Sequence, residues 1–581
     1  MTSLSAPAVK PGGRLAWEVL GLVVLTGWLT GLHLGQGALL DPDEPRVAIV
    51  MRLMAERGDW PAPHLPAIFR HDYPHDPLEG DLLAYWDKPP LAFWLGAAAM
   101  KVLGPTALAA RLPTGLSHLA AVLAVYFIGR LLWGGRAGFL AGAALATAPL
   151  ALALAHTARM DALLVALVTI VFLAILRLAY GAGRPWAWTL VLGVAAGLGL
   201  LTKGPEAVAI PAAACGVVLV LARGVGRLRW SHVAAAAAVA LAVAAPWYVY
   251  MHLRYPAMAD GSSEGFLYEF LWRQHFGRAM TGEYGHRGGP PGTLLGVTLG
   301  GFLPWTVFLP AAIAGLARQG WRERRTQPAV LLLLAWAAVV VGAFSLTKTQ
   351  MVHYVAPAFP ALALVAGAYL ADRLGAAGRD RWLRAGLAAT VVMGFLAAAG
   401  VTAYLVREDL LIRGGVWPAV LAAVVAAGLV SVVRDRRAAA VIMLVAWLVI
   451  AATFVLTSDP LKLSAERSTQ TESLTLLDEM RPGDDLVAYP YTPFSLAWHL
   501  WPREVRYPTS ADAPAEPSYP ALVAELNKPR RTFCVLQKRS ILEPLRKDVR
   551  WPIRVLSSMP DHTLLVTEPP EGAGAALPLQ R

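Results

Sequence analysis

The sequence predicts an all-α polytopic membrane protein, with about thirteen transmembrane helices, that ends in a small soluble α/β domain. The composition excludes an ordinary soluble protein, because 56% of the 581 residues are hydrophobic, only 15% are charged and the mean hydropathy is +0.50. Long apolar runs recur up to residue 456, and short strand and helix patterns replace them after residue 458. We therefore expect a transmembrane domain at 1–457 and a soluble domain at 458–581.

A membrane-spanning helix needs about 20 apolar residues. The candidate spans lie at 15–37, 108–132, 137–155, 162–180, 186–201, 207–221, 233–251, 294–316, 329–346, 354–370, 385–405, 417–433 and 438–456. The run 91–103 is shorter, and Lys101 interrupts it. We expect a re-entrant or interfacial helix there, or a leader to the second span.

The placement of arginine tests this count. If the N-terminus is cytoplasmic, every second connection should be basic. The basic connections lie near residues 130–136, 177–184, 223–229, 318–325, 373–384 and 434–437. Counting 91–103 as a span would put these clusters outside the cytoplasm. The loops that contain carboxylates and histidines lie on the other face, together with the tail, so we expect the chemistry there.

The net charge of +12 raises the question of a nucleic-acid partner. Because the arginines cluster in short connections between apolar runs, topology explains the charge, and we expect no nucleic acid. Cys215 lies in an apolar run and Cys534 in the tail, so no disulfide framework is expected. Residues 1–14 are too polar for a cleaved signal, and the first apolar run is long enough to remain as an anchor.

The tail contains the strand and helix patterns of a small α/β domain. Residues 486–489, 532–537, 553–557 and 563–566 predict short strands. Residues 472–480, 520–526 and 541–547 predict helices. The stretch 502–520, rich in Pro, Ala and Ser, is expected to be a loop.

The loop 41–90 carries the first set of candidate site residues. It has Asp43, Glu44 and Arg46 near its start, and Asp87 and Lys88 near its end. Carboxylates can bind a metal or act as a base, and a lysine can neutralise a phosphate. Taken alone, the acidic pair is better explained as part of a solvated loop. Only the combination favours a phosphate-bearing substrate.

A second acid, Asp161, enters an apolar segment just after Arg159. A charge there needs a partner, and Arg159 is too close in sequence to be the obvious one. A helix N-cap is the alternative interpretation. Lys203 joins two spans, and Lys348 precedes Tyr354. Both lysines are explained as well by side chains that extend to the interface.

The loop 252–292 has aromatic residues followed by His275, Arg278 and His286. An interfacial amphipathic helix would explain this pattern. The histidines and arginines favour an anionic headgroup partner somewhat more. No phosphate-binding glycine loop, dinucleotide fingerprint or zinc-finger spacing occurs, so we expect no nucleotide cofactor.

Taken together, these stretches resemble the GT-C class of lipid-linked-sugar glycosyltransferases, most closely the aminoarabinose transferase type that modifies lipid A, with protein O-mannosyltransferases as more distant relatives. The resemblance rests on short motifs in the same order along residues 15–370, at 43–46, 85–91, 159–161, 201–205, 266–291 and 353–357. The chain departs from the branch at Pro45-Arg46-Val47, where the branch tends to carry Thr-Arg-Tyr. This departure leaves the donor sugar open.

The resemblance implies a polyprenyl-phosphate sugar donor, a lipid or glycan acceptor, contact with membrane lipids, and an active site and tail on the periplasmic side of the bacterial inner membrane. It implies that Asp43 is the principal catalytic acid, with Asp161 as the second acid. Lys88 would contact the donor phosphate. Asp87 and His286 occupy positions that look like a metal site, so a divalent metal ion is expected.

We assign Glu44 to the catalytic acids beside Asp43. The further residues expected to bind the donor phosphate with Lys88 are Arg46, Arg278, Lys203, Lys348 and Tyr354. Direct attack of the acceptor on the anomeric carbon would invert the sugar. Three alternatives stay open at this point. They are protein O-mannosyltransferase-like transfer to Ser or Thr, a lipid-linked-sugar flippase or transporter, and a non-catalytic lipid-binding or assembly protein.

Overall fold

The computed structural model describes residues 13–70, 76–181, 183–257, 264–281, 289–376, 380–407, 416–458, 468–490, 492–500, 502–503, 505–506, 508, 517–559 and 562–570. The chain forms two compact units. The helical unit comprises Met1–Leu34, Asp87–Ala92 and Arg111–Ser458. The sheet unit comprises Gly35–Trp86, Phe93–Ala110 and Asp459–Arg581.

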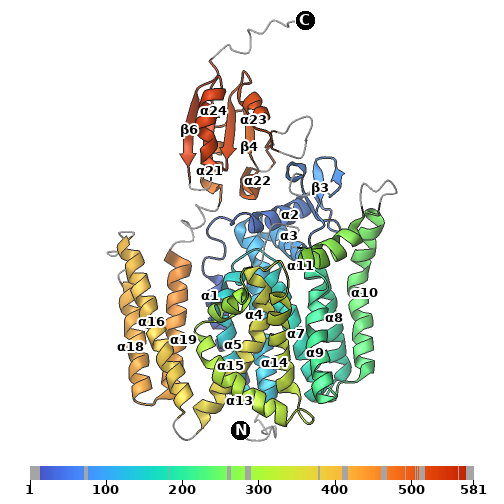
Figure 1. The fold of residues 1–581 in the computed structure, drawn as a ribbon, viewed down its shortest axis with the longest axis vertical. Coiled ribbons are helices and arrows are strands. Elements are labelled where there is room, and N and C mark those ends of the chain that lie inside the picture. The colour runs from blue at the N-terminus through green and yellow to red at the C-terminus, as the bar shows by residue number, and fades with distance from the viewer. Residues whose placement is uncertain are drawn as a thin grey trace. The chain divides into compact units, whose positions relative to one another are not determined.

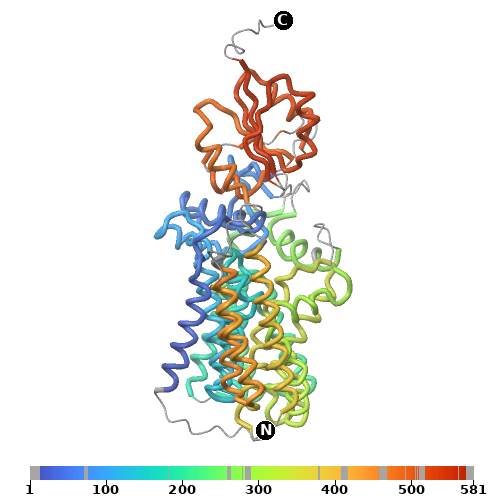
Figure 2. Tube along the Cα trace, turned by 90° about the vertical axis from the view of Figure 1, so that its left-hand side faces the viewer, coloured from blue at the N-terminus to red at the C-terminus, as the bar shows by residue number. Residues whose placement is uncertain are grey.

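The helical unit is built almost entirely from apolar helices (Figure 1). Its elements are α1 (Gly13–Gly31), α4 (Ala107–Trp133, whose first residues belong to the sheet unit), α5 (Gly135–Ala146), α6 (Pro149–Ala155), α7 (Asp161–Tyr180), α8 (Pro185–Lys203), α9 (Glu206–Ala222), α10 (Trp230–Arg254), the π-helical η2 (Tyr268–Gly277), α11 (Arg278–Thr281), α12 (Thr293–Gly301), η3 (Trp305–Phe308), α13 (Leu309–Arg322), α14 (Ala329–Ser345), η4 (Val352–Ala358), α15 (Phe359–Gly375), α16 (Arg381–Arg407), α18 (Val416–Val433) and α19 (Arg437–Ser458). Figure 2 shows the long helices of this unit running nearly parallel to one another.

The chain is a multi-pass integral membrane protein. Among the described residues, eight helices are long and apolar enough to cross a membrane. Two bent pairs, α5 with α6 at 65° and α12 with η3 and α13 at 105°, raise the number to as many as ten. The helices α9 and α14 are apolar but shorter. The polytopic helical class is therefore confirmed, while the number thirteen stays a prediction.

Small residues let the helices approach closely. A Cβ at Gly193 or Gly197 of α8 would lie 2.5 Å or 2.7 Å from the Cβ atom of Val239 or Val243 on α10. Glycines spaced by four residues place the backbones of two helices in direct contact, which favours association in lipid. As a result α7, α8 and α10 pack side by side (Figure 1).

Five exposed tryptophans lie at one end of the helical unit, whereas Trp28 and Trp272, which are 53 and 55% exposed, lie toward the other end. Trp17, Trp186, Trp230, Trp321 and Trp382 are 73, 62, 74, 53 and 59% exposed, and each lies in the first or last few residues of its helix. Tryptophan is enriched at membrane–water interfaces because one end of the ring is apolar and the other is polar. The same helix ends carry the arginine clusters of the sequence, so this end meets one interface of the membrane.

The sheet unit joins the first long connection to the tail of the chain. Its elements are α2 (Asp43–Arg57), β1 (His64–Pro66), η1 (Ala67–Phe69), β2 (Leu78–Glu79), β3 (Leu82–Ala84), α3 (Leu91–Leu103, which the helical unit shares), α21 (Gln470–Glu479), β4 (Asp485–Tyr489), α22 (Phe494–Leu500), α23 (Tyr519–Leu526), β5 (Thr532–Leu536), η5 (Arg539–Ile541), α24 (Leu542–Asp548), β6 (Ile553–Ser558) and β7 (Thr563–Thr567).

The stretch 41–90 is not the irregular loop that the sequence predicted. It contains the helix α2 and a three-stranded antiparallel sheet in the order β1-β3-β2. Pro45 is compatible with the first turn of α2, because the N–H that proline lacks has no partner there. The helix ends at Gly58, whose φ of 77° is left-handed and whose N–H donates to the carbonyl of Met54. The prediction was wrong because acidic residues and proline hid the amphipathic pattern that follows them.

The tail forms the predicted α/β domain. Its sheet has the order β4-β5-β7-β6, with β4 parallel to β5 and the other neighbours antiparallel. Alternate residues face opposite sides, so that Leu486 and Phe533 pack with α21 and α22, whereas Val487 and Cys534 pack with α23 and α24. The four strands and three helices that the sequence predicted are confirmed, and α22 was missed. Because residues 35–86 share this unit, the boundary at 457/458 stays a prediction.

Candidate active site

Polar residues gather at the end of the helical unit that lies opposite these five tryptophans. Asp161 is the first residue of α7, Lys203 the last of α8 and Glu206 the first of α9, while His353 and Tyr354 lie on η4. The helix α8 has Trp186 near its first residue and Lys203 as its last, so these two residues lie at opposite ends of one span. The geometry therefore agrees with chemistry on the face opposite the basic connections.

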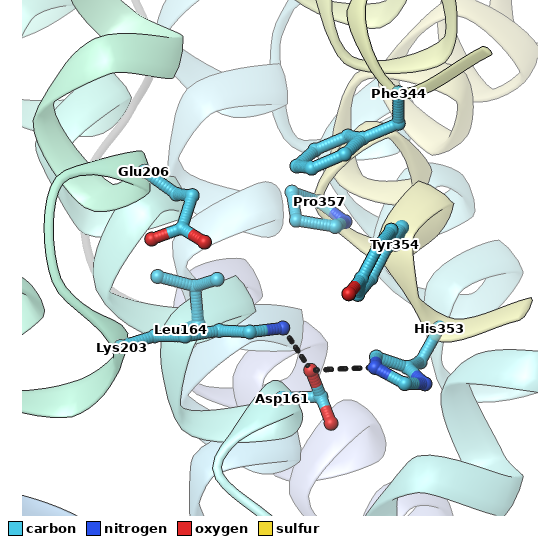
Figure 3. Close-up of a pocket in the computed structure, with 8 residues that line it drawn as sticks. All are labelled: Asp161, Leu164, Lys203, Glu206, Phe344, His353, Tyr354 and Pro357. Carbon is cyan, nitrogen blue, oxygen red and sulfur yellow. Dashed lines mark hydrogen bonds and ion pairs between the residues drawn. The ribbon is translucent and has the colours of Figure 1, made fainter. Parts of the chain in front are cut away.

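Asp161 is the centre of this group (Figure 3). Its side chain is 4% exposed, and Lys203 Nζ donates a hydrogen bond to Oδ1 at 2.6 Å. Arg159 Nε donates to Oδ2 at 3.2 Å, and His353 Nε2 lies 3.9 Å from Oδ1. A buried carboxylate is tolerated only when several donors compensate its lost hydration. Here the donors come from three separate elements, and the acid ties them together.

Three expectations about these residues were wrong. Asp161 is not a helix cap, because Met160 holds that position and no side chain caps the helix. Arg159 is a partner of Asp161 despite its closeness in sequence. Lys203 does not extend to the interface, since its side chain is 12% exposed and paired. One signal was available in the sequence. Consecutive antiparallel helices place the start of one beside the end of the next, which puts Asp161 near Lys203.

η4 contributes two rings to the group. Arg159 Nη2 lies 3.2 Å from His353 Nδ1, so the arginine bridges the histidine and Asp161. Lys203 Nζ lies 5.2 Å from the centre of the Tyr354 ring, within the range of a cation–π contact. The lysine is thereby held by a carboxylate and by an aromatic face.

A second acid–base pair borders the first. Glu206 Oε2 lies 3.5 Å from His275 Nε2. The other ring nitrogen of His275 donates to the carbonyl of Phe270 at 2.6 Å, and Nε2 lies 3.2 Å from the carbonyl of Lys203. A Cβ at Gly204 would lie 2.8 Å from His275 Nε2, and the φ of this glycine is +98°. Glycine is required here for both reasons. His275 therefore links η2 to the backbone that carries Lys203.

The residues around Asp161 enclose a small cavity (Figure 3). Its lining combines the acid–base groups with apolar side chains and consists of Asp161, Leu164, Lys203, Glu206, Phe344, His353, Tyr354 and Pro357. The cavity measures about 10 Å³, which is about the space of one water molecule. The sequence did not single out Leu164, Phe344 or Pro357, because apolar residues in apolar helices carry no signal of their own.

Asp87 and Lys88 belong to the same unit. Gln274 Nε2 of η2 donates to Asp87 Oδ1 at 2.7 Å, and Lys88 Nζ donates to the carbonyl of Asp87 at 2.9 Å. The predicted metal partner His286 lies outside the described residues. Within the described ranges, no group of three or more His, Cys, Asp or Glu could hold a metal ion. The metal site at Asp87 and His286 stays a prediction.

Two of the expected phosphate ligands add little to this geometry. Lys348 has an exposed side chain, and its N–H donates to the carbonyl of Ala279 at 2.9 Å. The side chain of Arg278 lies outside the described part of the chain. Neither residue is brought to Asp161 by a contact that the structure shows.

The remaining candidates lie in the sheet unit and are described there alone. Asp43 is the first residue of α2, and Arg46 Nη2 donates to its Oδ1 at 2.5 Å. The Asp43 side chain is 29% exposed. Glu44 is 2% exposed, and its Oε2 accepts the N–H of Leu40 at 3.0 Å. Glu44 thus stabilises the start of α2, whereas Asp43 faces solvent in part and can meet a substrate.

Comparisons with known proteins agree with this architecture. Residues 87–250 match the family model for dolichyl-phosphate-mannose-protein mannosyltransferase. Two crystal structures of ArnT from Cupriavidus metallidurans, one bound to undecaprenyl phosphate and one in the apo state, superpose with TM-scores of 0.72 and 0.74. They cover 95 and 97% of this chain and 98 and 100% of theirs, at 21 and 20% identity. This likeness establishes the fold.

Sequence relatives narrow the family. The chain is 30% identical over 399 residues to the undecaprenyl phosphate-α-4-amino-4-deoxy-L-arabinose arabinosyl transferase of Pectobacterium carotovorum, covering 67% of this chain and 66% of the relative. The chain belongs to the GT-C class and is related to its aminoarabinose transferases. It is also 30% identical over 370 residues to the Pseudomonas aeruginosa enzyme, covering 62% of this chain and 60% of that one. The matched part of this chain thus covers slightly less than two thirds of the length of these relatives.

Proposed function

We propose that the protein is an inverting membrane glycosyltransferase. It moves a sugar from a polyprenyl-phosphate donor to lipid A or to another cell-envelope acceptor. The observation that carries this proposal is the buried carboxylate of Asp161, which has Lys203, Arg159 and His353 around it at one end of the helical unit. Such a cluster can bind the polar part of a substrate whose apolar part stays in the membrane. The names of the relatives support undecaprenyl phosphate as the carrier.

The reaction breaks the bond between the anomeric carbon and the phosphate oxygen, and the acceptor oxygen forms the new bond. Negative charge develops on the leaving polyprenyl phosphate. Lys88 is the residue proposed to stabilise it, with help from Arg46, Arg278, Lys348 and the pair of Lys203 and Tyr354. A divalent ion at Asp87 and His286 would supply the same charge stabilisation when bound. Since attack comes from the face opposite the leaving group, the sugar inverts.

Asp43 is the acid proposed to act on the acceptor. If the acceptor is a hydroxyl group, its proton goes to the Asp43 carboxylate as the new bond forms. If it is a phosphate of lipid A, no base is needed, and Asp43 acts through its charge alone. Asp161, by contrast, has each oxygen in contact with a basic group. Its proposed role is to hold Lys203, Arg159 and His353 in place.

The proposed orientation puts the active site and the tail on the periplasmic face. The arginine clusters of the short connections lie at one end of the helical unit, and positive charge favours the cytoplasmic side. Asp161, Lys203 and Glu206 lie at the other end of the same helices. This agreement supports a donor and an acceptor that reach the site from outside the cytoplasm.

Transfer to Ser or Thr of a protein is the second candidate function. The family model that matches residues 87–250 describes a protein mannosyltransferase. The matched segment contains Asp87, Lys88, Asp161 and Lys203, so it covers the donor side of the proposed site. The acceptor side is where the two functions differ.

Purified protein in lipid nanodiscs tests the proposal. It is incubated with undecaprenyl-phosphate-linked 4-amino-4-deoxyarabinose and lipid A, and released undecaprenyl phosphate and the mass of lipid A are measured. We expect both products, in equal amounts. A Ser/Thr peptide that gains the sugar while lipid A does not would favour the second candidate. No release from this donor or from polyprenyl-phosphate hexoses, together with transbilayer movement of the intact donor in proteoliposomes, would establish a flippase.

A further inference from the structure

A contact within the sheet unit connects the tail domain to the candidate catalytic acid. The helix α22 of the tail packs against α2, which begins with Asp43. Phe494, the first residue of α22, is 6% exposed. The centre of the Arg46 guanidinium lies 5.7 Å from the centre of the Phe494 ring, and Arg46 Nη2 donates to Asp43 Oδ1 at 2.5 Å. Arg46 therefore lies between the tail and the acid.

Phe494 itself is held firmly. Its ring stacks on Phe69 with centres 4.2 Å apart and an interplanar angle of 19°. The next residue, Ser495, is fully buried, and both its N–H and its hydroxyl donate to the carboxylate of Asp41, two residues before Asp43. Thr469 N–H donates to the Ser495 hydroxyl at 2.9 Å. These contacts fix Phe494 and the residue that follows it against the stretch that carries Asp41 and Phe69.

A further contact joins Arg52, in the third turn of α2, to α22. Arg52 of α2 donates from Nη1 to the carbonyl of Trp498 at 3.0 Å, and its guanidinium lies 5.7 Å from the ring of Trp498. Two arginines of α2, six residues apart, therefore each meet an aromatic ring of α22. This repeated pairing sets the rotation of α2 about its own axis, and that rotation decides where Asp43 points.

We propose that Phe494 is a positioning residue for catalysis, which orients Asp43 through Arg46. This inference rests on the proposed glycosyltransferase function for its effect on rate. The face of an aromatic ring attracts a guanidinium, so Phe494 restricts Arg46 to the orientation that reaches Asp43. The soluble tail then has a part in the reaction, because it supplies the surface against which the acid is aligned.

The test combines substitution with a double-mutant cycle in the full-length protein. Phe494→Leu keeps an apolar side chain but removes the ring, and we expect a loss of about threefold to thirtyfold in kcat with the donor KM unchanged. Phe494→Tyr restores the ring and should restore kcat. In a protein that already carries Arg46→Met, Phe494→Leu should not lower kcat any further. Additive losses in the cycle would overturn the proposal.

Tyr519→Leu provides a matched control. It is also an aromatic-to-leucine change in the tail, on a helix that packs against the opposite face of the sheet. We expect it to leave kcat and the alignment of Asp43 unchanged. An equal loss of kcat in this variant would mean that any damage to the tail slows the enzyme, and the specific role of Phe494 would be excluded.

A readout without turnover separates this inference from the proposed function. Carbodiimide-driven labelling of carboxylates, followed by mass spectrometry, measures how accessible Asp43 is. We expect faster labelling of Asp43 in Phe494→Leu than in wild type, and the wild-type rate in Tyr519→Leu. An unchanged rate of Asp43 labelling in Phe494→Leu would contradict the inference even if the enzyme is active. Faster labelling in a protein without transferase activity would keep the positioning role and refute the function alone.

Discussion

Lys203 and Asp161 are 42 residues apart in the chain, yet Lys203 Nζ donates a hydrogen bond to Asp161 Oδ1 at 2.6 Å. The pair joins the end of α8 to the start of α7, and both side chains are almost fully buried. Breaking a buried pair by removing one partner leaves a charge without compensation. The pair therefore serves the stability of the site as well as its chemistry.

Lys203→Met should lower thermal stability and abolish transfer. Removal of one buried partner costs up to about 3–5 kcal/mol, and Arg159 and His353 reduce that loss because they stay in contact with Asp161. Differential scanning fluorimetry in detergent measures the change in Tm. The double variant Lys203→Met/Asp161→Leu should recover part of the Tm but none of the turnover. A single variant with wild-type Tm and kcat would show that the pair has neither role.

Gly204→Ala should destabilise the protein. The added Cβ would lie 2.8 Å from His275 Nε2, at a φ of +98° that residues with a side chain rarely adopt. We expect a loss of about 1–3 kcal/mol, seen as a lower Tm. Gly315→Ala is the control, because a Cβ at this helical position meets nothing within 4 Å. Equal Tm values for the two variants would contradict the tight approach of His275 to this turn.

The helical fold and the tail domain were predictable because their signals are local. Apolar runs locate the spans, and the short, nearly continuous apolar runs of β4, β5 and β7 are typical of strands buried on both faces. The helix α2 was missed because its acidic first turn and Pro45 favour a loop when read alone. Its ten buried residues gain their apolar surroundings only from distant parts of the chain.

The candidate site was predictable in its members but not in its contacts. Asp161 and Lys203 were both singled out, since charged residues beside apolar helices need an explanation. That Glu206 pairs with His275 depends on where η2 packs, and no periodicity in the sequence specifies that position. Long-range pairs of this kind follow from tertiary packing alone.

A reporter fused after Arg581 tests the topology. The basic connections lie at one end of the helical unit, and an odd number of spans would put the tail on the other side. Alkaline phosphatase, which is active only in the periplasm, should be active in this fusion. Green fluorescent protein exported by the same route should stay dark. The reverse pattern would mean that the span count is wrong by one.

Lys88→Ala should reduce turnover at saturating donor. A charge-assisted contact to phosphate contributes about 1.5–3 kcal/mol, which corresponds to about a tenfold to hundredfold loss in rate. The charge on the leaving phosphate grows in the transition state, so kcat should fall and not only the donor affinity. Lys101→Ala, on the exposed last turn of α3, is the control. Unchanged kcat in Lys88→Ala would contradict the proposed contact of this lysine with the donor phosphate.

The contact between Asp41 and Ser495 should depend on pH. Burial raises the pKa of Asp41 from 3.8 to about 6, although the hydrogen bonds from Ser495 and the charge of His562 act in the opposite direction. The folded protein therefore binds a proton more tightly than the unfolded chain does. The resulting stability is complete below about pH 4 and is lost as the pH rises through about 6.

A neighbouring pair has the opposite dependence. Glu472 Oε2 lies 3.1 Å from His562 Nε2, and Ser557 donates to the other carboxylate oxygen at 2.9 Å. Burial alone would raise the pKa of Glu472, but His562 and these hydrogen bonds lower it on balance. The stability from Glu472 is present above its ordinary pKa of 4.5 and is lost as the pH falls below that value. Between pH 5 and pH 7.5, two groups of the sheet unit therefore act in opposite directions. Asp41 favours the lower pH, whereas His499, whose pKa is lowered by burial from 6.5 to about 4, favours the higher pH.

Thermal unfolding of the full-length protein at pH 5 and pH 7.5 measures this effect. At pH 5, the Asp41 contribution to the stability of the tail should be about 1.4 kcal/mol larger than at pH 7.5, because pH 5 lies about one unit below the folded pKa. Asp41→Asn keeps the shape of the side chain and cannot titrate, so its Tm at pH 5, relative to its Tm at pH 7.5, should be lower than in wild type. Glu543→Gln, on the exposed part of α24, serves as the control and should keep the wild-type difference. If Asp41→Asn keeps it as well, another group is responsible for the pH dependence.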